Sequence, residues 1–373
     1  MKTFIKLLQA KGLLYGYLIT LLVLLFGGVI FIDVPTAALP DSEEPGADFS
    51  PLKPYILAEM KKNKLPGLSL AIFNDGGIEY TEGFGVKNAS TGEPVDETTI
   101  FEAASFSKTL TAYAALILME QGKLSLDEPL NKYLKEEYLP DPKYADKITL
   151  RMILTHTSGL SNASDGGDRK VYFPPGSYFS YSGAGFRYLQ QVLEDVTGLP
   201  FAQFMDQTII KPLSMNSSSF VLTKEMETLL ANGHEGGIST PIKKMNVNAA
   251  YSLLSTPTDM AKFNMEICHP TLLKQESVDR MLSPMVKWRS NIYWGLGMGL
   301  LQRPGEDFYW HWGNNYYYCS MMITGKASKQ GVVIMTNGNT GMKVAQRLAV
   351  KVINEYVLAE DNKIESGTFD FLL

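Results

Sequence analysis

Cysteine and histidine are scarce in this chain of 373 residues, which has two cysteines and four histidines. Two cysteines exclude a scaffold held by several disulfides, and Cys268 with Cys319 is the single pairing open to the chain. The histidines form no HExxH or related ligand spacing, and no glycine fingerprint for a dinucleotide is present. We therefore expect neither a metal nor an organic cofactor.

An excess of positive charge is also missing. Lysine and arginine number 34 against 39 aspartates and glutamates, a net charge of −5, which argues against a nucleic-acid partner. Hydrophobic residues make up 45% and charged residues 20%, an ordinary globular composition. The length predicts one large domain or two closely joined ones.

Charged residues are absent from residues 12–32, and a helix of that length rises about 30 Å, the thickness of a hydrocarbon core. Lysines precede the stretch and acidic residues follow it, so the C-terminal bulk is predicted to lie outside the cell membrane. A cleaved signal peptide with a site near residues 36–38 is the alternative, and it implies secretion. The apolar stretch exceeds the usual ~7–15 residues of a signal peptide, which favours a single-pass anchor.

These observations divide the chain into four parts. Residues 1–34 are predicted to be the anchor, and residues 35–50 a Pro-rich, acidic linker. Residues 51–358 are predicted to form the working domain, followed by a tail over 359–373.

Hydrophobic periodicity predicts strands at both ends of this domain and helices between them. Its first half shows helical patterns and a hairpin, and the middle is rich in helix and loop signals. The predicted helices are 51–63, 105–120 and 341–358, and the predicted strands are 68–73, 78–84, 294–301, 308–312, 316–324 and 331–336. We expect an α/β fold of the α+β type, with a mixed, mainly antiparallel sheet flanked by helices. A helical insertion over roughly 123–280 would leave a cleft for a small ligand.

A serine and a lysine stand one helical turn apart in Ser105-Phe106-Ser107-Lys108. A helix N-terminus at Ser105 would favour a developing anion, and burial would lower the pKa of Lys108. A neutral lysine can take the proton of a serine nucleophile. This four-residue pattern also occurs by chance in chains of this length, so it does not define a site alone.

Two further motifs follow in order, Tyr181-Ser182-Gly183 and His311-Trp312-Gly313. Three further segments, at residues 122–134, 150–160 and 254–263, carry residue patterns typical of the same family as these motifs. With these motifs the chain resembles the serine β-lactamase-like superfamily, in particular class C β-lactamases and related DD-peptidases. The resemblance spans about residues 50–358.

The resemblance implies roles for four residues. Ser105 would be the acylated nucleophile, and Lys108 and Tyr181 would transfer protons as general bases and acids. The backbone N–H groups of Ser105 and Asn314 would form the oxyanion hole, in which one donor contributes roughly 3 kcal/mol to transition-state stabilisation.

The third motif starts with His311 in place of the family's lysine, and His311 would tune the site or contact a substrate carboxylate. Gly313 would let the strand backbone approach the substrate. The second motif ends in Gly183, where the family has an asparagine that binds the lysine and a substrate amide. This departure points to esters or an unusual D-amino-acid substrate, with Asn314 and Asn315 as candidates to compensate.

The predicted function is therefore an extracytoplasmic, membrane-tethered serine hydrolase acting on a small-molecule or cell-envelope substrate. An ester or a D-amino-acid amide fits, as in a D-alanyl esterase or DD-carboxypeptidase. The alternatives are a non-catalytic penicillin-binding-like sensor module and a true class C-like β-lactamase. His156 is predicted to be structural, and residues 316–318 to pack within a strand.

Overall fold

The computed structural model describes residues 47–163, 169–359 and 362–372. From Ala47 onward the chain forms one compact unit. The predicted anchor and nearly all of the linker lie outside the described residues. Within the described ranges, no helix combines the length and apolar character that crossing a bilayer requires.

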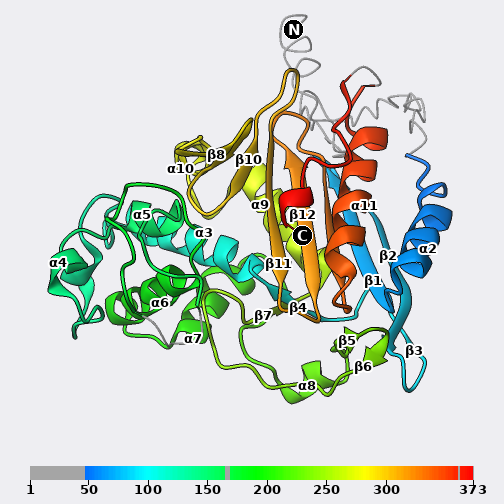
Figure 1. Ribbon diagram of the computed structural model, residues 1–373, viewed down its shortest axis with the longest axis horizontal. Coiled ribbons are helices and arrows are strands. Elements are labelled where there is room, and N and C mark those ends of the chain that lie inside the picture. Colours follow the sequence, from blue (N-terminus) through cyan, green and yellow to red (C-terminus); the bar gives the residue numbers. More distant parts are fainter. Residues whose placement is uncertain (1–46, 164–168, 360–361, 373) are drawn as a thin grey trace, which may run out of the picture. The chain divides into compact units, whose positions relative to one another are not determined.

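A nine-stranded sheet forms the centre of this unit (Figure 1). Every pairing between its neighbouring strands is antiparallel, which confirms the mainly antiparallel sheet. The first hairpin joins the last strand, because β1 pairs with β13. The strands, in spatial order, are β3 (Glu93–Pro94), β2 (Gly77–Asn88), β1 (Gly67–Asn74), β13 (Gly331–Thr336), β12 (Cys319–Gly325), β11 (Phe308–Asn314), β10 (Gly299–Leu301), β9 (Ile292–Trp294) and β8 (Val286–Arg289).

Two helices, α2 (Leu52–Asn63) and α11 (Gly341–Tyr356), cover one face of the sheet (Figure 1). Alternation along β1 sends Leu68 and Leu70 into the core under these helices, and Phe73 into the core on the other face. The tail returns to the α2–α11 side through Phe369, which is buried against Trp310.

Helix α3 (Phe106–Glu120) and helix α9 (Pro257–Cys268) belong to the second face. Helix α3 is buried from Phe106 to Leu118, so it is the central helix of a largely helical region. Residues 123–280 are largely helical, as predicted for the insertion, and part of this segment packs against α3, which precedes it. The other helices of the region are α4 (Pro142–Ala145), α5 (Leu150–Leu154), α6 (Gly183–Thr197), α7 (Phe201–Met205), α8 (Lys224–Glu227) and α10 (Gln275–Met281), with short 3₁₀ or π turns at Leu130–Tyr133, Asp206–Ile210 and Asp370–Leu372. Two small strand pairs complete it, β4 (Phe101–Ala104) with β7 (Leu253–Ser255) and β5 (His234–Glu235) with β6 (Ile238–Ser239).

Two expectations about strands were wrong. The run 294–301 is not one strand, because Gly297 takes a positive φ of 88° and separates β9 from β10. Residues 316–318 form the turn before β12, where Tyr316 has a φ of 65°. The pairing of the two cysteines is absent, since Cys268 and Cys319 are both free.

Candidate active site

Ser105 lies between β4 and α3, at the N-terminal end of the helix. Its hydroxyl makes no capping hydrogen bond, so the oxygen is available for chemistry. The preceding residue, Ala104, has a φ of 50°, and the β4–β7 register shifts just before it. Such strain in a non-glycine residue is costly and often marks a functional position.

Lys108 points back at the serine one turn earlier. Its Nζ atom lies 3.0 Å from Ser105 Oγ and donates to the carbonyl oxygen of Ala250 at 2.8 Å. Burial lowers the pKa of Lys108 to about 7, because the charged ammonium loses its hydration. Lys108 is therefore neutral in about half of the molecules near pH 7, and in this form it can accept the serine proton.

Tyr181 reaches the same place from the segment before α6. Its ring centroid lies 4.9 Å from Lys108 Nζ. Its buried hydroxyl has no hydrogen-bond partner of normal geometry in the part of the chain described, although the nearby Ser105 hydroxyl favours its ionised form. Burial dominates and raises the pKa of Tyr181, so the phenol keeps its proton at neutral pH.

His156 accepts hydrogen bonds from the residues immediately before and after Tyr181. The backbone N–H of Ser180 donates to the carbonyl of His156 at 2.8 Å, and the N–H of Ser182 donates to His156 Nδ1 at 3.0 Å. The two rings, of His156 and Tyr181, lie 4.3 Å apart between centroids. These contacts agree with the structural role predicted for His156, and the residue that they surround is Tyr181.

His311 lies in β11 with its ring 6.2 Å from that of Tyr181. Burial lowers its pKa to about 3, helped by the charge of Lys108, so the imidazole is neutral. Nδ1 lies 2.7 Å from the Trp312 carbonyl, while the buried Nε2 is unpaired among the described residues. A neutral imidazole fits the tuning role better than a contact with a carboxylate.

The end of β11 carries the other expected residues. Strand β10 pairs with β11 along Phe308–Trp310. Residues His311–Asn314 of β11 therefore extend past the end of β10. A Cβ on Gly313 would meet the Ser320 hydroxyl and, at 2.5 Å, the carbonyl of Ala103. Gly313 thus lets β11 pack against the segment just before Ser105, which brings the end of β11 close to the nucleophile.

Gly183 is the first residue of α6, where Ser182 caps the helix by accepting from Gly185 N–H. Neither candidate for compensation binds Lys108. The Asn314 side chain accepts from the N–H of Tyr316, and Asn315 donates to Glu102.

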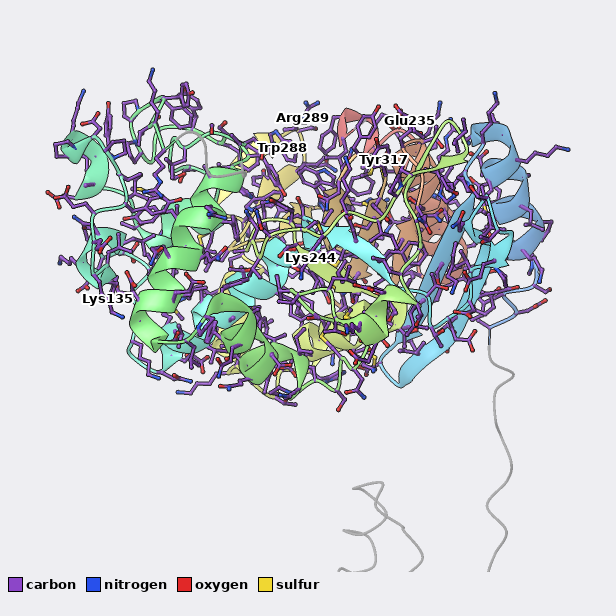
Figure 2. All side chains as sticks on the ribbon, turned by 90° about the horizontal axis from the view of Figure 1, so that it is seen from below. Lys135, Glu235, Lys244, Trp288, Arg289 and Tyr317 are labelled. Carbon is purple, nitrogen blue, oxygen red and sulfur yellow. The ribbon has the colours of Figure 1, made fainter. Side chains whose placement is uncertain are left out.

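All four tryptophans gather beside Tyr181, a feature that sequence reasoning missed because they are spread over β8, β9 and β11. The Trp312 ring lies 4.7 Å from that of Tyr181 and 6.1 Å from that of Trp288. Trp288 and Trp312 are half-buried, so this aromatic cluster reaches the surface. The Arg289 guanidinium lies beside this aromatic cluster, with its central carbon 4.5 Å from the centroid of the Phe371 ring. Figure 2 labels Trp288 and Arg289 together.

Comparisons with known proteins agree with this fold. A family model described as beta-lactamase matches residues 52–354. Protein flp of Staphylococcus aureus is 23% identical over 325 residues, which cover 79% of this chain and 65% of the relative, less than two thirds of its length. The putative penicillin-binding protein PbpX of Bacillus subtilis is 27% identical, covering 74% of this chain and 71% of the relative. The octameric penicillin-binding protein homologue from Pyrococcus abyssi superposes with a TM-score of 0.72 at 25% identity, covering 82% of this chain and 77% of that one.

Proposed function

The chain belongs to the beta-lactamase family, and from this premise we propose that it is a serine hydrolase that forms an acyl-enzyme on Ser105. The observation that carries the proposal is the 3.0 Å contact between Ser105 Oγ and the Nζ atom of a lysine that burial keeps partly neutral. Such a pair is an activated nucleophile with its base in place.

The proposed reaction has two halves. Neutral Lys108 takes the hydroxyl proton while Ser105 Oγ attacks the substrate carbonyl carbon. The backbone N–H groups of Ser105 and Asn314 stabilise the oxyanion. Tyr181 gives a proton to the leaving group as the carbonyl–heteroatom bond breaks, and is reprotonated from Lys108. Water then attacks the acyl group by the same route, which releases the acid and restores Ser105.

We propose an ester or a D-amino-acid amide whose leaving group carries no carboxylate. His311 is neutral, and the Lys108 ammonium is occupied by Ser105 and Ala250. Arg289 belongs to the aromatic cluster but is separated from Tyr181 by tryptophan rings. None of these three described groups therefore offers a leaving-group carboxylate a direct cationic partner, whereas the aromatic rings favour an uncharged group.

The test is the intact mass of the protein after brief exposure to p-nitrophenyl acetate. We expect an acetyl adduct or steady product release in the wild type and in Ser177→Ala, which removes an exposed serine. Neither should occur in Ser105→Ala. Absence of both from the wild type would refute the hydrolase and favour a non-catalytic binding module. Steady hydrolysis of a cephalosporin would instead identify a β-lactamase and refute the preference for uncharged leaving groups.

A substrate pair tests the leaving-group proposal. We expect a D-alanyl-D-lactate depsipeptide with its terminal carboxylate to be hydrolysed more slowly than the same compound capped as a carboxamide. The reverse order would refute this part of the proposal and leave the acyl-enzyme intact.

We also propose an extracytoplasmic, membrane-tethered location. The uncharged stretch 12–32 with lysines before it and acidic residues after it supports this, although it lies outside the described residues. Protease added outside intact cells should remove the domain, and protection from it would contradict the proposal.

A further inference from the structure

A cavity of about 440 Å³ is lined in part by chain neighbours of the proposed active-site residues. Six of the residues that line it are Glu102, Lys243, Met245, Tyr251, Asn315 and Tyr317. Figure 2 labels Tyr317 near Glu235, far from Lys135 at the other end of the view.

Three lining residues are chain neighbours of the active-site groups. Glu102 precedes Ser105 by three residues, so their Cα atoms are at most about 11 Å apart. Tyr251 follows Ala250, whose carbonyl holds Lys108, and Asn315 follows Asn314. The wall of the cavity therefore begins within about 11 Å of the nucleophile's Cα atom, a span that an extended acyl substituent can cover.

Glu102 is the unusual group in this wall. Its Oε2 accepts a hydrogen bond from Asn315 Nδ2 at 2.7 Å, and Asn315 also donates to the Tyr251 carbonyl at 3.3 Å. Over the described ranges, Glu102 Oε1 accepts no hydrogen bond, and no cation forms an ion pair with the carboxyl. Lys243 lines the cavity too, but it is exposed and makes no ion pair with Glu102 in that part of the chain.

Partial burial raises the pKa of Glu102 to about 7, because the half-buried carboxylate loses part of its hydration without gaining a cation. A buried charge is costly unless it is paired. The carboxyl is held in place by Asn315, with one oxygen open, and so it suits an incoming hydrogen-bond donor of positive charge.

We propose that this cavity is a subsite for the acyl part of the substrate and that Glu102 binds an amino group carried there. The inference rests on the proposed function and deepens it. Tyr181, which protonates the leaving group, borders the aromatic cluster, and neither Tyr181 nor the tryptophans line the cavity. The cavity is thus left for the other half of the substrate, and the substrate class becomes aminoacyl esters or amides.

The test compares p-nitrophenyl esters of ε-aminocaproic acid and heptanoic acid, in which a methyl group replaces the ammonium. Assays run near pH 8, where Glu102 is mostly ionised and the amine is still protonated. For the wild type we expect a kcat/KM ratio of about tenfold in favour of the amino ester, the size of a charged hydrogen bond. A ratio of one or less overturns the proposal without any variant.

Glu102→Gln keeps an acceptor for Asn315 and removes the charge, so the ratio should fall to near one, mostly through KM for the amino ester. The matched control is Glu235→Gln, whose exposed carboxyl accepts from the Tyr316 hydroxyl and does not line the cavity, and it should leave the ratio unchanged. An equal loss for both esters in Glu102→Gln would show a structural role and overturn the subsite. Equal turnover of both esters by the wild type leaves the hydrolase standing, whereas no turnover and no adduct on Ser105 refutes the hydrolase and the subsite together.

Discussion

The pH dependence of acylation follows from the environment of Lys108. The rate requires the neutral amine, and burial lowers the pKa of Lys108 to about 7. From about pH 6 to pH 8 the neutral fraction then rises from about 9% to about 91%, so kcat/KM should increase about tenfold and level off above pH 8. With the ordinary pKa of 10.5, only about 0.3% would be neutral at pH 8, and the rate would still climb tenfold per pH unit there.

The assay is the initial rate of p-nitrophenyl acetate hydrolysis at low substrate concentration, corrected for spontaneous hydrolysis. Lys108→Arg should lose about 10²–10⁴-fold in kcat/KM, because a guanidinium does not deprotonate in this range. The control Lys262→Arg makes the same exchange at a lysine paired with Asp259 and should keep the wild-type profile. A wild-type rate that still rises tenfold per unit above pH 8, or an active Lys108→Arg, would refute the assignment of the base.

Three further substitutions test the parts around the nucleophile. Tyr181→Phe keeps the ring and removes the hydroxyl, so kcat should fall about 10²-fold or more with an unchanged melting temperature, and full activity would contradict proton transfer by this residue. His156→Ala removes the acceptor of the Ser182 N–H, and we expect kcat to fall much more than KM in steady-state kinetics; a wild-type kcat would argue against positioning. Gly313→Ala places a Cβ against the Ala103 carbonyl, so urea unfolding should show a loss of about 1–3 kcal/mol and adduct formation should slow, and an unaltered protein would disprove the close packing.

Local patterns predicted the two ends of the domain well. The helix expected over 51–63 is α2 at Leu52–Asn63, and the hairpin expected from the strands 68–73 and 78–84 joins β1 and β2. These elements follow from alternation, helical period and turn residues, which are properties of short segments. The run 294–301 misled the prediction, because its apolar composition is shared by two short strands and the turn packed between them.

The candidate site was predicted in part. The three motifs named the residues that meet around Ser105 and Tyr181, and the structure brings them together. His156 was predicted to be structural, and its hydrogen bonds agree with that prediction. That these bonds hold the two neighbours of Tyr181 could not be predicted, because they join segments that are distant in the chain. No sequence pattern pointed to Glu102 as a binding residue, because a single glutamate in a strand is usually a surface residue. Its contact with Asn315 and its place in the cavity wall became visible only in the structure.

The sequence by itself determined the pairing of Ser105 with Lys108, because residues three apart on a helix share one side whatever surrounds them. It also determined the succession of strands, helices and strands that the sheet requires. Only the tertiary structure decided the state of charge of the site. Burial by segments far apart in the chain lowers the pKa of Lys108 to about 7, keeps His311 neutral, and leaves Glu102 a carboxyl without a cation. Desolvation depends on everything packed around a group, and no short stretch of sequence contains that information.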